Sequence, residues 1–415
     1  MTRLALGLSG GGDSTALLLA LREAAPDIAL HAYIVDHGLR AESGDEARLA
    51  ADTARAAGAA ARILGWTAPR KSQARARVAR HRLLAEACRA DGVSILCLAH
   101  TREDRIETLR MRARRAGPPT RLAGPGPLDP SPVWPEGRGL LIARPLLDLT
   151  RHQLRAYLRA RGAAWIEDPS NADPAYERTR LRADPVSETT NRRLIEQSEA
   201  ARRALEAEKA AARAVLDAGA VFTSWGGARL DPAAFSGDGA PRALETLLLA
   251  VSGRAEPPAP GLVESGLRAV QTGASWTGAG ALLTKTGFLG RDPGAAGRAD
   301  GAPAPVLHLA EGEIGVFDGR WEIGGPARLE MLGARRPEGV DFGGIPAPFR
   351  VSLPFEAQSG AVIAGERSGA RLIVAERITA RLMALKAPAW FDGVCAEARA
   401  CAALAKPRAR SNIGS

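Results

Sequence analysis

The chain has 415 residues, and its 56 basic and 46 acidic side chains give a formal net charge of +10. This length suits two or three domains, and the basic balance suits a polyanionic partner, although a genome that prefers arginine gives the same balance. Four cysteines without a Cys-x-x-Cys pair argue against zinc, iron–sulfur and disulfide frameworks. No apolar run reaches the ~18 residues of a membrane span and no signal peptide is evident, so we expect a cytoplasmic protein.

The first expected element is a buried strand over residues 4–8, which leads through a glycine-rich turn into a helix. At such a turn, backbone N–H groups and the positive end of the helix dipole form an anion site that glycine leaves open. Asp13 adds a carboxylate that suits Mg²⁺ beside phosphate oxygens, and two serines add hydroxyl donors. The turn lacks the Walker A lysine and the dinucleotide fingerprint spacing, so it predicts a pyrophosphate-binding loop, or else a turn serving only chain geometry. Its residues are Ser9, Gly10, Gly11, Gly12, Asp13 and Ser14.

A polar segment follows a second expected strand, over residues 28–35. In open parallel sheets, ligands bind at the carboxyl ends of the strands, so this segment is a candidate part of the same site. The alternative is an Asp-His pair that is merely solvated at a strand end. The residues of the segment are Asp36, His37, Gly38, Leu39 and Arg40.

Ser43 is expected to cap the next helix, with Glu46 completing a capping box. After a short strand, an arginine-rich helix is expected over residues 73–90. Arg77 and Arg80 share one face of that helix, which is either solvated or close to phosphate.

A strand expected over residues 93–99 leads into a segment with several acids. Asp104 and Glu107 are i,i+3 neighbours on the helix that follows, so they share a face. Two carboxylates beside a nucleotide site can bind Mg²⁺ or the ammonium group of a substrate. The alternative is that they only complement the helix dipole. A loop rich in proline and glycine is then expected over 117–139, followed by a strand and a helix that begins at Thr150.

Five blocks in this half of the chain resemble the tRNA(Ile)-lysidine synthetase family of the N-type ATP pyrophosphatase (PP-loop) superfamily. The resemblance covers about residues 3 to 183. Three positions depart from the family pattern, namely Glu103 for aspartate, Arg105 for glutamine and Thr179 for asparagine. The blocks are Ser9–Ser14 (SGGxDS), Val35–Arg40 (VDHGLR), His100–Thr108 (AHxxDDQxET), Arg144–Leu147 (RPLL) and Trp165–Arg182 (WxEDPSN…YxRNxxR).

The resemblance implies a Rossmann-like α/β domain with a parallel, doubly wound sheet over residues 1–184. It implies that ATP adenylates O2 of the wobble cytidine of a CAU-anticodon tRNA(Ile), and that free L-lysine then attacks C2 and expels AMP. ATP and Mg²⁺ are the implied cofactors. The site residues expected on this basis are Asp36, Asp104 and Glu107 for catalysis; Ser9, Gly10, Gly11, Gly12, Asp13, Ser14, His37 and Arg40 for ATP; Asp13 and Asp104 for the metal; and Arg112, Arg178 and Arg182 for tRNA.

The second half of the chain carries no cluster of catalytic groups. Residues 185–256 are expected to form a helical connector, and residues 257–415 a smaller α+β region with a hairpin turn at Asp318-Gly319. That region is expected either to hold tRNA or to form a homodimer. Two other functions stay open, a PP-loop tRNA thiolase and a catalytically inactive tRNA-binding homologue. The first is disfavoured because Cys88 and Cys97 have the wrong spacing.

Overall fold

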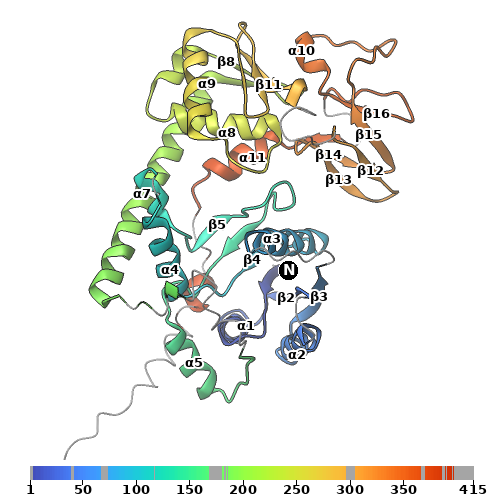
Figure 1. Ribbon diagram of the computed structural model, residues 1–415. Coiled ribbons are helices and arrows are strands. Elements are labelled where there is room, and N and C mark those ends of the chain that lie inside the picture. Colours follow the sequence, from blue (N-terminus) through green and yellow to red (C-terminus); the bar gives the residue numbers. More distant parts are fainter. Residues whose placement is uncertain are drawn as a thin grey trace, which may run out of the picture. The chain divides into compact units, whose positions relative to one another are not determined.

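The structure is a computed structural model in which the chain forms two compact units (Figure 1). The first unit comprises residues 1–205 and 385–415, and the second comprises residues 206–384. The division falls within helix α7 (Glu188–Gly219) and coincides with neither boundary expected from the sequence, at residues 184 and 256. The structure describes residues 3–38, 42–66, 73–115, 117–167, 180–181, 184, 186–295, 304–365, 370–385, 388, 390–394 and 396.

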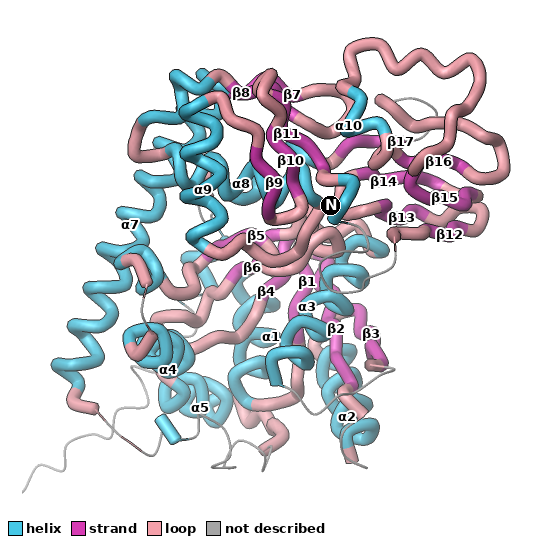
Figure 2. Tube along the Cα trace, turned by 45° about the horizontal axis from the view of Figure 1, so that its top comes forward, coloured by secondary structure: helices cyan, strands magenta, loops and turns pink. Residues whose placement is uncertain are grey.

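A six-stranded sheet in the order β3-β2-β1-β4-β6-β5 organises the first unit (Figure 2). All neighbouring strands are parallel except β5, which pairs with β6 in the antiparallel sense. The predicted α/β class is therefore confirmed, with one antiparallel edge strand added. The strands are β1 (Arg3–Gly7), β2 (Ala29–Asp36), β3 (Ala60–Gly65), β4 (Ile95–Cys97), β5 (Leu128–Pro130) and β6 (Leu141–Ala143).

Helices cover both faces of this sheet. Because side chains alternate along a strand, Leu6 of β1 points to one face and Ala5 to the other. The Leu6 cluster also takes in residues of α1, α2 and α5, whereas the Ala5 cluster takes in Leu84 of α3. The doubly wound arrangement follows from this alternation. The helices are α1 (Gly12–Ala24), α2 (Ser43–Ala56), α3 (Gln73–Ala90), α4 (Arg102–Ala113) and α5 (Arg151–Ala160).

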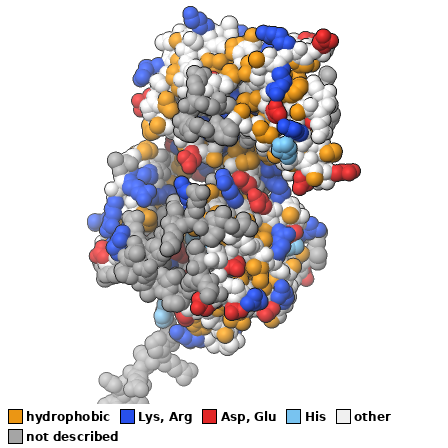
Figure 3. Space-filling view, turned by 45° about the vertical axis from the view of Figure 1, so that its right-hand side comes forward, with side chains coloured by type: hydrophobic (Ala, Val, Ile, Leu, Met, Phe, Trp, Pro, Cys, Tyr) orange, Lys and Arg blue, Asp and Glu red, His pale blue; other side chains and the backbone are white. Residues whose placement is uncertain are grey.

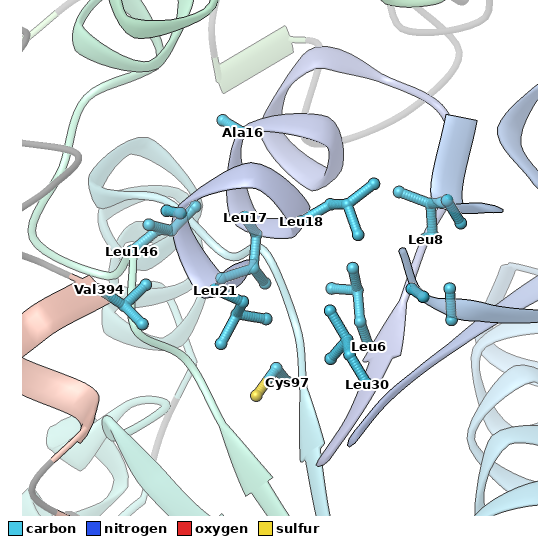
Figure 4. Packing of buried hydrophobic residues seen from close by; sticks show 14 of the residues in the cluster. Leu6, Leu8, Ala16, Leu17, Leu18, Leu21, Leu30, Cys97, Leu146 and Val394 are labelled. Carbon is cyan, nitrogen blue, oxygen red and sulfur yellow. The ribbon is translucent and has the colours of Figure 1, made fainter. Parts of the chain in front are cut away.

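The C-terminal part of the chain adds to the core of the first unit. Phe391 and Val394 are buried in the same cluster as Leu17 and Leu21 of α1. Figure 4 shows Val394 beside Leu21 and Leu146. The α1 face of the sheet is thus closed by residues more than 350 positions further along the chain.

Two local expectations are wrong. Ser43 does not cap α2, because its hydroxyl donates instead to Oδ1 of Asp36 at 2.7 Å, and Glu42 is the N-cap. The loop expected over residues 117–139 is partly regular, since it contains the 3₁₀ helix η1 (Pro119–Ala123) and strand β5. Buried Leu128 gives β5 an apolar anchor that outweighs the surrounding prolines and glycines.

The described residues of the second unit form three antiparallel sheets. One has the order β7-β8-β11-β10-β9 and packs with α8 (Ala240–Ser252), α9 (Pro260–Thr272) and α11 (Val374–Leu382). The others are β12-β15-β16 and β13-β14-β17. The remaining elements are β7 (Ala220–Phe222), β8 (Ala228–Leu230), η3 (Pro232–Ser236), β9 (Trp276–Gly278), β10 (Ala281–Leu283), β11 (Phe288–Arg291), η4 (Pro293–Ala295), β12 (Leu307–Leu309), β13 (Ile314–Phe317), β14 (Trp321–Gly324), β15 (Ala327–Met331), α10 (Ala347–Arg350), β16 (Pro354–Glu356) and β17 (Ala370–Leu372).

The expected hairpin turn joins β13 to β14. Asp318 and Gly319 have φ angles of 49° and 65°, as a type I′ turn requires at both central positions. Within the described residues of either unit, no helix combines the length and apolar character needed to cross a membrane.

Candidate active site

The glycine-rich turn joins β1 to α1 as expected, and side-chain hydrogen bonds hold it in shape. The Ser14 hydroxyl donates to the Gly11 carbonyl at 2.9 Å and accepts from the Ser9 backbone N–H at 3.2 Å. The Thr15 hydroxyl donates to the Gly10 and Gly11 carbonyls at 3.2 and 3.1 Å. These bonds satisfy the carbonyl groups of Gly10 and Gly11 and so hold the turn in one conformation.

Gly10 has a structural reason to be glycine. Its φ of +79° lies in the left-handed region, and a Cβ there would approach Cδ1 of Ile166 to 2.6 Å. Ile166 also donates its backbone N–H to the Gly10 carbonyl at 3.0 Å. The segment around residue 166 therefore fixes the loop from the outside.

A cavity of about 700 Å³ opens beside this loop, at the carboxyl ends of β1, β2 and β4. It is the position at which an open parallel sheet binds its ligand. Arg77 and Arg80 of α3 bring positive charge to the wall, and Asp13 and Asp104 bring negative charge. The lining residues are Gly7, Ser9, Asp13, Ser14, His37, Ala76, Arg77, Arg80, His81, Leu98, Ala99, His100, Asp104 and Met111.

Three acids that come from α1 and α4 meet at Arg151. Nη2 of Arg151 lies 2.6 Å from Asp104, Nε lies 3.4 Å from Asp13, and Nη1 lies 3.5 Å from Glu107. The shared helix face expected for Asp104 and Glu107 is confirmed by these contacts. Arg155 adds a second cation, with Nη1 3.1 Å from Oδ1 of Asp13.

The two acids expected to hold a metal differ in their electrostatics. Burial raises the pKa of Asp13 above its usual value, despite the opposing charges of Arg155 and Arg151. Burial acts the same way on Asp104, but Arg151 and the hydrogen bonds from Thr101 outweigh it and hold the pKa of Asp104 below its usual value. Asp104 also completes a capping box with Thr101, so one of its oxygens caps α4 while the other faces Arg151. The helix-capping role and the charge-cluster role therefore coexist.

The donor set fits a magnesium ion that phosphate oxygens help to hold. Mg²⁺ usually takes one or two carboxylates together with substrate phosphates and water, and Asp13 and Asp104 both line the cavity. Among the residues that the structure describes, no group of three or more His, Cys, Asp or Glu side chains is placed to hold a metal.

Three histidines line the cavity, and the pKa of each is lowered. Burial lowers the pKa of His37, with a further contribution from Arg80, and the His37 ring meets Trp66 edge-on at 5.9 Å between centroids. Burial together with the Arg77 and Arg80 charges lowers the pKa of His81 to about 4. The pKa of His100 is lowered in the same way, chiefly by burial. Among the described residues, the Nδ1 atom of each ring has no hydrogen-bond partner.

Asp36 lies beside the cavity wall rather than among its lining residues. Its Oδ1 accepts hydrogen bonds from the Gly38 N–H at 2.9 Å and the Ser43 hydroxyl at 2.7 Å, and these bonds lower the pKa of Asp36. Arg112 donates to the Arg121 carbonyl at 3.0 Å and so braces the segment after α4. Three other candidates lie outside the described residues, namely Arg40, Arg178 and Arg182.

Sequence reasoning assigned no role to Arg151 and Arg155, although both reach the predicted acids. The sequence contained one signal for their joint action, because two arginines at i,i+4 in the first turns of a helix share one face. The departures from the family pattern in α4 have local explanations. Glu103 accepts the Arg151 backbone N–H with both oxygens at 3.1 Å, and Arg105 pairs with Asp148 and Glu199 at 3.1 and 3.4 Å. Thr179 lies outside the described residues.

Comparison with known proteins gives matches over both the N-terminal part and most of the chain. Residues 1–188 match a PP-loop domain family, whose members bind ATP. The tRNA(Ile)-lysidine synthase of Caulobacter vibrioides is 37% identical over 345 residues, which cover 80% of this chain and 76% of that protein. That of Hyphomonas neptunium is 46% identical over 187 residues, which cover 44% of this chain and 50% of that protein.

A solved structure of the U34-tRNA thiolase NcsA from Methanococcus maripaludis with its 4Fe-4S cluster aligns with a TM-score of 0.38 at 15% identity. That alignment covers 49% of this chain and 70% of the other, and no conclusion is drawn from it. The Caulobacter match extends far beyond the PP-loop domain and covers three quarters of the relative. This match agrees with the glycine-rich loop and with the acid cluster that Asp13, Asp104 and Glu107 form around Arg151. The chain therefore belongs to the tRNA(Ile)-lysidine synthase family.

Proposed function

We propose that this protein ligates free L-lysine to C2 of the wobble cytidine of a CAU-anticodon tRNA(Ile), with ATP converted to AMP and pyrophosphate. The observation that carries the proposal is the cavity in which the PP-loop, two arginines of α3 and Asp104 of α4 face one another. Family membership supports the substrate class, because the relatives are named for this tRNA.

In the first step, O2 of the cytidine attacks the α-phosphorus of ATP and pyrophosphate leaves. The loop N–H groups and Arg77 and Arg80 are placed to stabilise the charge that develops on the leaving group. Asp13 and Asp104 would hold Mg²⁺, which would supply further neutralisation of the phosphate charge. The C2 carbon of cytidine is a poor electrophile, and adenylation of O2 gives it a good leaving group.

In the second step, the lysine side-chain amine attacks C2 and AMP leaves with the C2 oxygen. The ammonium form of lysine must first give up a proton, and a base such as an ionised carboxylate near the site is needed to receive it. Asp36 is our candidate for this base, and hydrogen bonds from Gly38 and Ser43 hold its pKa below the usual value. Asp104 and Glu107 are proposed to hold the lysine ammonium beside the nucleotide.

Recognition of tRNA is proposed to use Arg112, Arg178 and Arg182 together with the region over residues 257–415. On the face shown in Figure 3, basic side chains are scattered among acidic and apolar ones. The net charge of +10 suits an RNA partner in general terms only. A homodimer formed through the C-terminal region remains an alternative proposal for that region.

The test is incubation of the purified protein with ATP, Mg²⁺, radiolabelled lysine and a CAU-anticodon isoleucine tRNA transcript. Label retained on the RNA, and lost when the wobble cytidine is changed to uridine, is the expected result. AMP release with tRNA but no label would overturn the choice of lysine as nucleophile. Binding of tRNA without AMP release would favour the inactive homologue. An Asp36→Asn variant with unaltered turnover would remove Asp36 as the base.

A further inference from the structure

One guanidinium lies at the centre of the acid cluster. The three nitrogens of Arg151 each approach a different carboxylate, those of Asp13, Asp104 and Glu107. Asp13 belongs to the PP-loop, whereas Asp104 and Glu107 belong to α4. A single side chain therefore ties the phosphate-binding loop to the helix that carries the other acids.

The cluster is shielded from water. The exposed side-chain fractions are 6% for Glu107, 14% for Asp104 and 26% for Arg151. Charges interact more strongly in such a place than at an open surface, so carboxylates left without a cation would repel one another. Glu103 accepts the backbone N–H of Arg151, so α4 holds this arginine by its main chain as well as by its side chain.

We propose that Arg151 is a positioning residue that serves as the resident counter-ion of Asp13, Asp104 and Glu107 and hinders divalent cations from binding there before a nucleotide arrives. A metal ion entering alone must compete with Arg151 for Oδ1 of Asp104 and Oδ2 of Asp13. A metal ion that enters with ATP brings phosphate oxygens as its own ligands. Those phosphates also offer the displaced guanidinium a new anionic partner.

The inference rests on the proposed use of ATP with Mg²⁺ at this site, but its test needs neither tRNA nor lysine. Mn²⁺ is titrated into the full-length protein without nucleotide, and free Mn²⁺ is followed by electron paramagnetic resonance. The variants are Arg151→Met, which removes the charge at similar length, and Arg151→Lys, which keeps the charge but lacks the planar guanidinium fork that spans the three acids. Arg161→Met is the matched control, because Arg161 pairs with Glu23 at the other end of α5 at 2.6 Å.

We expect Arg151→Met to bind Mn²⁺ at least tenfold more tightly than the wild type, and Arg151→Lys roughly threefold more tightly. Arg161→Met should bind as the wild type does. Adding Asp104→Asn to Arg151→Met should abolish the gain, which would place the ion at the cluster. A merely structural arginine predicts the opposite, since its loss would disorder the acids and weaken Mn²⁺ binding.

Unchanged or weaker Mn²⁺ binding by Arg151→Met would overturn the proposal. If Arg151→Met does not fold, as judged by circular dichroism, Arg151→Lys decides the matter, and wild-type affinity there would also overturn it. Failure of the wild type to form lysidine would contradict the proposed function and would leave the Mn²⁺ measurement standing.

Discussion

Gly12 and Arg155 occupy the same corner of the site, because a Cβ on Gly12 would lie 1.9 Å from Nη1 of Arg155. The Arg155 guanidinium therefore crosses the first turn of α1, where it pairs with Asp13 at 3.1 Å and lies 5.3 Å from the centroid of the Trp165 ring. Helix N-termini bind anions, so this cation adds to the field that a nucleotide phosphate meets.

Gly12→Ala is expected to act through Arg155 rather than through the fold. The clash involves the far end of a flexible side chain, so the guanidinium moves aside while alanine is well accepted in a helix. We expect the KM for ATP to rise roughly tenfold, equivalent to about 1.4 kcal/mol. Arg155→Ala should raise it by a similar factor, and the double variant should be no worse than either single variant.

The control for this pair is Gly65→Ala, because a Cβ added to Gly65 would have no neighbouring atom within 4 Å. It should leave the KM for ATP unchanged. If the effects of Gly12→Ala and Arg155→Ala simply add in the double variant, the proposed route from Gly12 through Arg155 is wrong.

Arg105→Gln restores the residue that the family pattern has at this position, and it should be nearly silent in activity. Arg105 is buried, but its partners Asp148 and Glu199 are 64% and 53% exposed, so they regain water when the arginine is removed. We expect the free energy of unfolding to fall by at most about 1–2 kcal/mol, mainly through lost packing of the arginine stem.

Urea denaturation and the lysine-labelling assay measure these two quantities. Glu199→Gln is the control that removes one ion pair while keeping the buried stem, and it should cost less stability than Arg105→Gln. A loss of more than about tenfold in kcat at unchanged stability would instead place Arg105 in the catalytic machinery.

Much of the first unit could be predicted because its signals are local. The glycine-rich turn and the helices over 73–90 and 188–219 follow from composition and periodicity over short windows. Strand β5 could not be predicted, because its residues form a strand only by pairing with β6. The roles of Arg151 and Arg155 were missed for a related reason. Arg155 and Asp13 are 142 positions apart, and only the packing of α5 against α1 brings them together.

The acids were easier to find than their cations. Asp13 and Asp104 each lie in the first turn of the helix that follows a parallel strand. The rule that ligands bind at the carboxyl ends of parallel strands identifies such positions. Arginine is abundant throughout this chain, so no single arginine stands out before the tertiary contacts are known. The position of Asp36 outside the cavity lining likewise depends on Ser43, whose hydroxyl was expected to cap α2.

Cys88 and Cys97 should be inert toward thiol reagents in the folded protein. Both side chains are buried, and burial raises the pKa of Cys88 to about 12 and raises the pKa of Cys97 as well. The reactive species is the thiolate, which is nearly absent under these conditions. A Cys395→Ser/Cys401→Ser variant should therefore show no rapid reaction with a disulfide reagent at pH 8, and two reactive thiols after unfolding.

This experiment also bears on the thiolase alternative. An enzyme that carries sulfur on a cysteine needs an accessible thiolate, and neither Cys88 nor Cys97 offers one. Rapid reaction of one thiol in the folded Cys395→Ser/Cys401→Ser variant would contradict the structure and reopen that function. The wild-type protein is the control, because it also reports the reactivity of Cys395 and Cys401.

His81 should make the first unit less stable as the pH falls below about 6.5. Its folded-state pKa is about 4, lowered by burial and by the charges of Arg77, Arg80 and Arg144, whereas an unfolded histidine has its usual value of about 6.5. Above pH 6.5 both states are neutral and the residue has no effect on stability. Between about pH 6.5 and 4 the unfolded state takes up the proton first, so stability is lost by up to about 1.4 kcal/mol per pH unit.

The measurement is the free energy of unfolding from urea denaturation between pH 7.5 and pH 5, for the wild type and for His81→Gln. His37 and His100 titrate in the same sense, so the wild-type curve alone does not isolate His81. The difference between the wild-type and His81→Gln stability curves isolates the contribution of His81, because the other histidines are common to both proteins. We expect His81→Gln to lose less stability than the wild type on acidification. Parallel curves would show that His81 has the same pKa in the folded and unfolded states, against the burial and the three positive charges that surround it.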